Sequence, residues 1–257
     1  MLELNKIYLG DCLEVMNDIP DGSVDAIITD PPYGTTACKW DSVIPFEPMW
    51  EQLKRIIKPK GAIVLFGSEP FSSALRLSNV SMYRYDIVWN KKKPSNFQMM
   101  NFQPGRIHEY IHVFSDKPAV FSKKGTMTYF PIKENIKPIT RKKSFYGSRN
   151  STLRKRHTIK DLGEKTSNSK NKYYSIVEFS NANTKSKVYP TQKPVSLLEY
   201  LIRTYTNEGE TVLDFTIGSG TTAIAAIKTG RNFIGIEKDQ SCFDLANKRI
   251  KDAMETS

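Results

Sequence analysis

The sequence contains few cysteines and no long apolar run, and each absence excludes a class of protein. Its three cysteines, Cys12, Cys38 and Cys242, are too few and too scattered for a disulfide framework or a zinc site, so we expect no metal. No apolar stretch approaches the roughly 20 residues that cross a bilayer. The first residues read MLELNKIYLGDCLEV, with acids where a secretory signal peptide has a basic end and an apolar run. We therefore expect a protein of the reducing cytoplasm that does not contact a membrane.

The net charge of +11 is unevenly distributed over the 257 residues, which suffice for one large domain with an insertion. Residues 91–190 hold 22 basic and 6 acidic residues, whereas the rest of the chain holds 16 basic and 21 acidic residues. A basic middle joined to a mildly acidic remainder indicates a surface that faces a polyanion. A solvated basic face is the other interpretation, and charge alone does not decide between the two.

Apolar periodicity predicts strands that alternate with helices on both sides of the basic segment. Strands are expected over 6–10, 24–29, 62–66, 83–89, 110–114, 211–215 and 232–236. Helices are expected over 12–19, 49–57, 194–205 and 240–254 and after the glycines at 218 and 220, with a turn at 59–61. This alternation predicts a doubly wound α/β sheet. The stretch from 117 to 187 is rich in Lys, Ser, Asn and Thr and has little periodicity, which is typical of an insertion that orders on binding.

The segment IITDPPYGTTACKW, residues 27–40, ends an apolar run with an acid, two prolines and a tyrosine. One interpretation is a rigid turn. The other is a cup that holds a flat aromatic ring and accepts hydrogen bonds from it. Proline nitrogens offer no competing N–H donor, and the ring of Tyr33 supplies a face on which a flat ring can stack. The remaining motifs decide between the two interpretations.

A second segment, VLDFTIGSGTTAIAA, has the form of a strand, a Gly-x-Gly turn and a helix. Glycines at 218 and 220 allow a tight turn and a close approach of the backbone to a ligand. Glu237 closes the following strand, 23 positions after Asp214, where a carboxylate can bind both hydroxyls of a ribose. This spacing favours a nucleoside-containing cofactor over a plain connection between strand and helix.

Taken together, these segments resemble the DNA amino-methyltransferases that use S-adenosylmethionine. Seven stretches match family motifs in the correct order: YLGDCLEVM with PDGSVDAIITDPPYG, Trp40-Asp41, IIKPKGAIVLFG, WNKKKPSNF, GRIHEYIHVF, YPTQKP and DFTIGSGTT. The resemblance covers about residues 4–116 and 188–252. Because DPPY comes first and the glycine motif comes near the C-terminus, the order resembles that of the β class, which is circularly permuted.

The resemblance implies a Rossmann-like α/β methyltransferase sheet, circularly permuted, with a basic target-recognition insertion. Residues 1–116 would form the catalytic half of the methyltransferase domain, 117–187 the DNA target-recognition insertion, and 188–257 the cofactor-binding half of the same domain. The implied reaction is transfer of a methyl group from S-adenosylmethionine to adenine N6 in double-stranded DNA. A base inside a duplex does not reach such a cup, so the target would be flipped out.

The resemblance also implies roles for individual residues. The catalytic residues would be Asp30, Pro31, Pro32 and Tyr33. Among the cofactor-binding residues, Asp11 and Cys12 would lie near the adenine, Glu237 at the ribose, and Thr191 and Lys193 near the methionine carboxylate. The turn around the methionine part would be formed by Asp214, Gly218, Ser219 and Gly220. The remaining cofactor-binding residues would be Asp30, Phe215, Thr216, Thr221 and Thr222. DNA contacts are expected at Lys91, Lys93, Arg141, Lys142, Lys143, Arg154, Lys155 and Arg156.

Two further expectations concern residues beside these motifs. Phe215-Thr216 stands where the family has Pro-Phe, which puts in doubt the aromatic contact that the family makes near its cofactor. His108 and Glu109 are expected to hold structure near the active site and not to perform chemistry.

Three alternatives remain open at this point. Cytosine N4 is an amine of the same geometry, although that activity more often accompanies Ser-Pro-Pro-Tyr, so the acid at Asp30 favours adenine. RNA or a protein glutamine amide is another substrate class, against which the basic insertion favours nucleic acid. A DNA-binding module with an inactive fold is the third. The recognition sequence, a homodimer and a cognate restriction endonuclease are not decided by the sequence.

Overall fold

The computed structural model describes residues 2–35, 41–123, 125–132, 174–180 and 192–255. The chain divides into two compact units, one formed by Met1–Ile132 together with Ser175–Ser257 and the other by Lys133–Tyr174. Nearly all of the second unit lies outside the described residues, and the described fold is that of the first unit.

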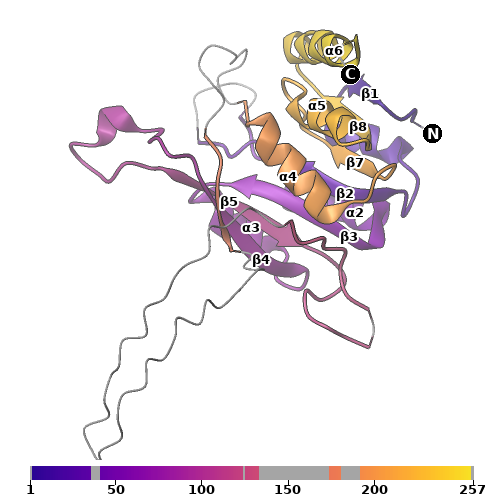
Figure 1. Cartoon of the computed structure of the whole chain (residues 1–257), viewed down its shortest axis with the longest axis horizontal. Coiled ribbons are helices and arrows are strands. Elements are labelled where there is room, and N and C mark those ends of the chain that lie inside the picture. The colour runs from indigo at the N-terminus through magenta and orange to yellow at the C-terminus, as the bar shows by residue number, and fades with distance from the viewer. Residues whose placement is uncertain (1, 36–40, 124, 133–173, 181–191, 256–257) are drawn as a thin grey trace, which may run out of the picture. The chain divides into compact units, whose positions relative to one another are not determined.

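Among the described residues, a mixed sheet of eight strands runs through the first unit (Figure 1). The strands are β1 (Lys6–Leu9), β2 (Val24–Thr29), β3 (Ile57–Gly67), β4 (Tyr83–Asn90), β5 (His108–Phe114), β6 (Ile176–Glu178), β7 (Thr211–Asp214) and β8 (Asn232–Glu237). Their order across the sheet is β1-β8-β7-β2-β3-β5-β4-β6. β5 pairs antiparallel with β3 and β4, and the other neighbouring pairs are parallel. The predicted α/β class is thereby confirmed.

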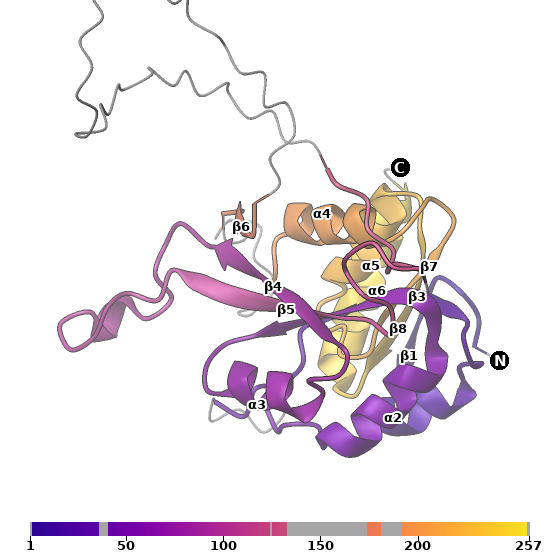
Figure 2. The same ribbon diagram turned by 90° about the horizontal axis from the view of Figure 1, so that it is seen from below.

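Helices cover both faces of this sheet. Within the described ranges they are α1 (Cys12–Val15), α2 (Phe46–Ile56), α3 (Phe71–Ser78), α4 (Val195–Tyr205), α5 (Thr221–Lys228) and α6 (Gln240–Glu255), with 3-10 turns η1 (Met16–Asp18) and η2 (Phe97–Met99). Figure 2 shows α4, α5 and α6 on one side of the sheet and α2 and α3 on the other. No helix in the described part of the chain has the length and apolar character that a membrane span requires.

Alternate residues of β2 enter two apolar clusters, one on each face of the sheet. Ala26 and Ile28 pack in the cluster that contains Leu201 of α4, whereas Ile27 packs in the cluster that contains Leu53 of α2. All five side chains are fully buried. Because both faces of β2 are covered, the strand reads as a continuous apolar run and does not alternate with polar residues.

The two halves of the domain meet in the middle of the sheet. β7, from the C-terminal half, lies parallel to β2, and Leu213 pairs with Ile27. β1, from the N-terminal half, pairs with β8, where Tyr8 is opposite Ile236. The carboxyl ends of β2 and β7 therefore lie side by side, and the motifs that follow them share one edge of the sheet. Open α/β sheets bind their ligands at this edge.

The structure differs from the sequence expectation in β3. The turn expected at 59–61 is a bulge inside the strand, because Val24 pairs with Ile57 while Ala26 pairs with Ala62. A Cβ at Gly61 would come 2.7 Å from the carbonyl oxygen of Asp25, so the bulge leaves no room for a side chain. Glycine is required at position 61 because two strands approach closely there, and not because the chain reverses.

Two further differences concern elements that the sequence did not predict. α3 is absent from the expected helices. Parts of the expected insertion belong to the first unit: β6 extends the sheet beside β4, and Met127 is buried in the core. The N–H of Phe130 donates to the carbonyl of Thr204 at 2.7 Å, which ties this segment to the end of α4.

Candidate active site

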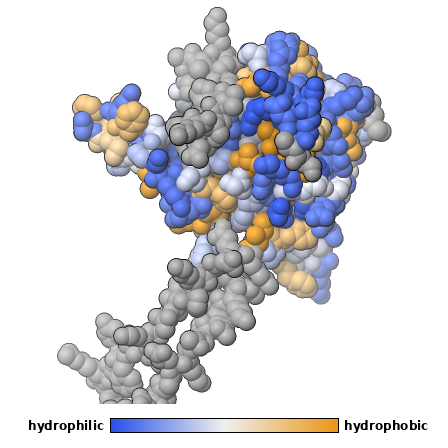
Figure 3. All heavy atoms as spheres, turned by 45° about the horizontal axis from the view of Figure 1, so that its top comes forward, coloured by the Kyte–Doolittle hydropathy of each residue, from blue (hydrophilic) through white to orange (hydrophobic). Residues whose placement is uncertain are grey.

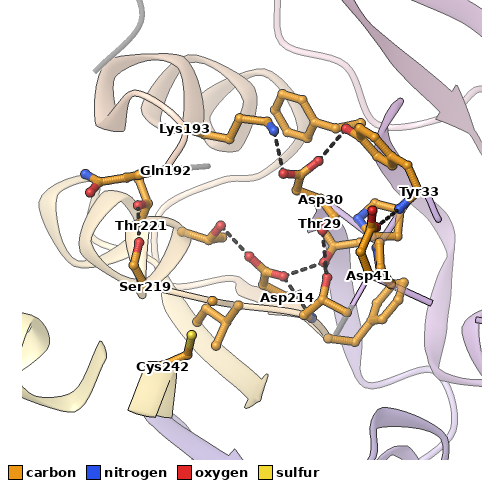
Figure 4. Close-up of a pocket in the computed structure, with 18 of the residues that line it drawn as sticks. Thr29, Asp30, Tyr33, Asp41, Gln192, Lys193, Asp214, Ser219, Thr221 and Cys242 are labelled. Carbon is orange, nitrogen blue, oxygen red and sulfur yellow. Dashed lines mark hydrogen bonds and ion pairs between the residues drawn. The ribbon is translucent and has the colours of Figure 1, made fainter. Parts of the chain in front are cut away.

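A cavity of about 880 Å³ opens at the carboxyl ends of the parallel strands. Its wall includes Asp11 after β1, Asp30 after β2, Thr216 after β7 and Glu237 at the end of β8. Figure 4 shows Asp30 and Asp214, from the two halves of the chain, facing the same space. The fold therefore brings the Asp-Pro-Pro-Tyr motif and the glycine motif into one site.

Most of the residues that the sequence assigned to the site line this cavity. They are Asp11, Cys12, Asp30, Pro31, Pro32, Tyr33, Lys91, Lys93, Lys193, Asp214, Phe215, Thr216, Gly218, Ser219, Thr221, Thr222 and Glu237. Among the described residues of that set, Gly220 alone does not. Thr191, Arg141, Lys142, Lys143, Arg154, Lys155 and Arg156 lie outside the described residues, and their roles stay predictions.

Both carboxylate oxygens of Asp30 already accept hydrogen bonds (Figure 4). Oδ1 accepts from the hydroxyl of Tyr33 at 2.5 Å, and Oδ2 pairs with the ammonium of Lys193. Burial raises the pKa of Asp30, and the positive charge of Lys193 offsets part of that rise. Burial and the charge of Asp30 together hold the pKa of Tyr33 well above its usual range, so its hydroxyl stays protonated and donates.

Lys193 connects Asp30 to a second acid, Glu109 on β5. Its Nζ lies 3.4 Å from Oε2 of Glu109, whose Oε1 lies 3.0 Å from Nζ of Lys91. Burial lowers the pKa of Lys193, but the two acids outweigh burial and raise it, so the ammonium keeps its charge at neutral pH. The result is a row of alternating charges, in agreement with the expectation that Glu109 holds structure beside the site.

The structure does not support Lys91 as a phosphate contact. Its side chain is 2% exposed, and its ammonium donates to Oγ of Ser95 at 3.1 Å in addition to Glu109. An ammonium whose partners lie inside the protein has no free surface for a phosphate. Lys93 is exposed and lines the cavity, and its contact with DNA stays a prediction.

Lys93 lies in the segment between β4 and β5, which projects beyond the sheet (Figure 1). Residues 91–107 contain three lysines, one arginine and no acid. The segment also exposes the apolar side chains of Phe97, Met99, Met100 and Phe102. Figure 3 shows orange spheres among blue ones on the projection at its left. A segment of this charge beside the cavity suits a polyanion.

Asp41 shapes the turn that follows Asp30. Its Oδ1 accepts from the N–H of Tyr33 at 2.8 Å and of Gly34 at 2.9 Å, and its Oδ2 accepts from the N–H of Thr35 at 2.9 Å. Hydrogen bonds to a charged acceptor are stronger than those between neutral groups, so three of them fix this backbone firmly. The ring of Tyr33 stacks on Phe71 of α3, with centroids 5.1 Å apart, and the unpredicted helix thus supports the ring.

Asp214 is buried at the end of β7 and accepts from threonine hydroxyls and a backbone N–H. Thr29 donates to Oδ1, Thr222 donates to Oδ2 at 2.5 Å, and the N–H of Thr216 donates to Oδ1 at 3.2 Å. Burial raises the pKa of Asp214 to about 6. These bonds fix the shape of the turn on which the glycine motif begins.

Glu237, the last residue of β8, also lines the cavity. Its Oε2 accepts from the N–H of Gly218 at 2.8 Å, and its Oε1 accepts from the N–H groups of Lys238 and Asp239 at 2.9 Å and 2.8 Å. A carboxylate has about four acceptor positions, so these bonds leave capacity for a hydroxyl. Asp11, Gly218 and Glu237 line the same cavity, and their predicted roles at the adenine, methionine and ribose parts of S-adenosylmethionine stay predictions.

Gly220 of the predicted cofactor site packs against a helix. It precedes α5 with φ +80°, and a Cβ there would come 3.0 Å from Cβ of Ala246 in α6. Cys12 lines the cavity, and burial raises the pKa of its thiol to about 11, which favours the neutral thiol.

Thr29 and Asp41 are site residues whose contacts the sequence did not predict. Thr29 is the last residue of an apolar strand, and no spacing marks its hydroxyl as a partner of Asp214. Asp41 belongs to the Trp-Asp pair that follows the Asp-Pro-Pro-Tyr motif. The match to the family marked this pair in the sequence but did not predict the three hydrogen bonds that Asp41 accepts.

The comparisons with known proteins agree with this geometry. A family model described as DNA methylase, N6_N4_Mtase, matches residues 24–248. The chain belongs to this family. Type II methyltransferase M1.MboII of Moraxella bovis is 29% identical over 96% of each chain. Type II methyltransferase M.HinfI of Haemophilus influenzae is 29% identical over 97% of this chain and 69% of its own length.

Solved structures show the same fold. M1.HpyAVI in complex with SAM has a TM-score of 0.61 and 25% identity, covering 95% of this chain and 98% of that one. The cytosine-N4-specific PvuII DNA methyltransferase has a TM-score of 0.66 at 15% identity, covering 97% and 91%. The second likeness concerns the fold alone. The chain therefore has the Rossmann-like methyltransferase fold that the resemblance implied.

Proposed function

We propose that this chain transfers a methyl group from S-adenosylmethionine to the N6 amine of an adenine flipped out of double-stranded DNA. The observation that carries the proposal is the carboxylate of Asp30, which shares one cavity with Glu237 and the glycine turn at Gly218. Membership of the DNA methylase family supports the reaction class, and the SAM complex of the relative M1.HpyAVI supports the cofactor.

The cofactor would be held by the acids and the glycine turn. Glu237 would bind the ribose hydroxyls, Asp11 would lie near the adenine, and residues 216–219 would hold the methionine part. When bound, S-adenosylmethionine supplies a methyl group that its positive sulfur has already activated. The contribution of the protein is then chiefly to position the target amine.

Asp30 would prepare that amine for attack. The lone pair of an exocyclic amine is delocalised into the ring, so the amine is a poor nucleophile. Acceptors at Asp30 and at the carbonyl of Pro31 would bind its two hydrogens and free the lone pair. Asp30 does not need to be a strong base, because the methylated product can lose its proton late.

Asp30 has acceptor capacity left for the amine, because a carboxylate has about four acceptor positions and two of them are in use. The ammonium of Lys193 has a second acceptor nearby, since Oε2 of Glu109 lies 3.4 Å from its Nζ. A small shift of this ammonium towards Glu109 would make more room for the base at Oδ2 of Asp30. Tyr33 would keep its bond to Oδ1 and present its ring to the base.

The target base would reach this cup only when flipped out of the duplex. Lys93 and the basic residues of the insertion would bind phosphates, which position the duplex without reading sequence. The Type II names of the two relatives support a role in restriction–modification, with a cognate endonuclease as the partner enzyme.

Cytosine N4 is the second candidate target, because its amine has the same geometry and a cytosine-N4-specific enzyme shares the fold. The acid at Asp30 favours adenine. Mass spectrometry of nucleosides decides between them, with DNA taken from a host that lacks its own DNA methyltransferases. We expect N6-methyladenine with the native chain and none with Asp30→Ala.

Other results would overturn parts of the proposal. N4-methylcytosine would move the target to cytosine while sparing the cofactor site. No methylated base, with soluble protein that binds S-adenosylmethionine, would overturn DNA as the substrate.

A further inference from the structure

Thr216 occupies a position at which this chain departs from the family pattern, since the motif reads Phe215-Thr216 in place of Pro-Phe. A phenylalanine at 216 has no hydroxyl. In this structure the hydroxyl of Thr216 makes contacts that an aromatic side chain does not reproduce. The departure therefore introduces a polar group between the two halves of the site.

The hydroxyl of Thr216 contacts two residues of the catalytic strand. Its Oγ1 donates to the main-chain carbonyl of Asp30 at 3.1 Å and lies 2.8 Å from Oγ1 of Thr29. Thr29 in turn donates to the carboxylate of Asp214, which also accepts from the N–H of Thr216. Thr216 thus joins the carboxylate at the end of β7, through its N–H, to the main chain of the residue that would accept the target amine, through its hydroxyl.

These hydrogen bonds are buried and end on the main chain of Asp30, so they restrict where its backbone lies. Asp214 is 5% exposed and Thr29 is 1% exposed, so water does not readily replace these partners. Thr216 is β-branched, and its side chain therefore has few alternative rotamers. The bonded oxygen belongs to the backbone of Asp30, so the contact fixes where its Cα stands relative to the glycine turn.

We propose that the hydroxyl of Thr216 is a positioning group, which sets the main chain of Asp30 against the turn that would hold the methionine part of the cofactor. This inference rests on the proposed function. Thr216 lies two residues before Gly218, so its hydrogen bond to Asp30 ties the position of the glycine turn to the end of β2. Loss of the hydroxyl releases Asp30 while leaving the acids that would bind the nucleoside in place.

Thr216→Val tests the proposal, because valine has the shape of threonine and keeps the backbone N–H that bonds Asp214. A displacement of about 1 Å can slow a positioned reaction roughly 100-fold, so we expect the single-turnover rate of methyl transfer to fall roughly 10- to 100-fold. The Kd for S-adenosylmethionine, measured by calorimetry, should stay within about threefold, since valine keeps the size of the side chain and the main chain of the turn at residues 216–219. Thr216→Ser restores the hydroxyl and should recover most of the rate.

Thr204→Val is the matched control, because the buried hydroxyl of Thr204 donates to the main-chain carbonyl of Tyr200 at 2.7 Å in α4, away from the cavity. It should leave the rate unchanged. An unchanged rate in Thr216→Val, or a parallel loss of cofactor binding, would overturn the positioning role. An equal loss in Thr216→Ser would do the same. Inactive native protein in the same assay would instead count against the proposed function.

Discussion

The ammonium of Lys193 pairs with the carboxylate of Asp30, although the two residues are 163 positions apart in the sequence. The sequence predicted Lys193 near the carboxylate of the cofactor, and that role stays a prediction; the structure places its ammonium against Asp30, which we propose as the acceptor for the target amine. Its second partner is Glu109 at 3.4 Å. The pair joins the two halves of the methyltransferase domain at the point where we propose that chemistry occurs.

Replacing Lys193 should change the pH at which the enzyme becomes active. Burial raises the pKa of Asp30 and Lys193 lowers it, so Lys193→Met should raise that pKa further. Asp30 accepts the amine when ionised, so activity is present above its pKa and is lost as pH falls through it. The acid limb of the single-turnover rate should therefore move to higher pH, with a rate at neutral pH roughly 10- to 100-fold lower.

Lys193→Arg is the control for this prediction, since it keeps a positive charge near Asp30. Its acid limb should stay close to that of the native protein. If Lys193→Met left the acid limb where it is, the ammonium would not set the ionisation of Asp30.

Glu109→Gln should destabilise the fold, because Glu109 pairs with two buried ammonium groups. Lys91 is 2% exposed and would lose the one anion within 4 Å among the described residues. Removing one partner of a buried pair costs about 3 kcal/mol or more, which urea denaturation can measure. Glu178→Gln is the matched control: its pair with Lys92, at 3.2 Å, is exposed and should contribute less than about 1 kcal/mol. Equal effects of the two changes would contradict a special role for the buried row of charges.

His112 should make the fold sensitive to acid. It is fully buried in β5, and within the described residues neither ring nitrogen has a hydrogen-bond partner. Burial lowers its pKa from 6.5 to about 4. The unfolded chain therefore binds a proton more readily, and stability falls as pH drops from about 6.5 towards 4, by about 3 kcal/mol in total.

His112→Leu removes this titration, and the difference between the two stability profiles isolates it. Asp214, whose raised pKa of about 6 acts in the opposite direction, is common to both proteins and cancels. His108→Gln on the same strand is a control for the loss of a histidine. Parallel profiles for the native protein and His112→Leu between pH 4 and 6.5 would refute the prediction.

The two glycines of the motif should respond differently to alanine. Both have positive φ, which costs an alanine about 1 kcal/mol. Gly220→Ala also places a Cβ 3.0 Å from Cβ of Ala246, so its loss of stability should reach about 2–4 kcal/mol. Gly218→Ala should cost less stability but weaken the binding of S-adenosylmethionine, because Gly218 lines the cavity and bonds Glu237. Thermal unfolding and calorimetry separate the two effects.

Much of the fold follows from local patterns in the sequence. The apolar run before Asp30 predicted β2 to the residue, because a strand buried on both faces is apolar throughout. The strand, glycine turn and helix around Gly218 were also predicted, because an apolar run, two glycines and an alanine-rich stretch follow one another in the sequence. The bulge at Gly61 was not, since a glycine that reports close backbone contact looks like one that reports a turn.

The contacts of the site depend on distant segments and were less predictable. The ion pair of Lys193 and Asp30 requires α4 to lie beside β2, and a motif match alone does not give that geometry. Lys91 was expected to contact DNA. The pairing of β4 with β5 brings it beside Glu109, with which its buried ammonium forms an ion pair. The sequence showed only that Thr216 replaces an aromatic residue of the family pattern. The hydrogen bond from its hydroxyl to the carbonyl of Asp30 depends on the three-dimensional structure.

Single-turnover methyl transfer by the native chain and by Asp30→Asn tests the central claim most directly, with calorimetry of S-adenosylmethionine binding on both proteins. Asparagine keeps the size of the side chain but replaces one acceptor oxygen with a donor. We expect a Kd for the cofactor within about threefold of native and a rate at least about 100-fold lower. A native rate in Asp30→Asn would contradict the assignment of Asp30 as the acceptor that prepares the target amine.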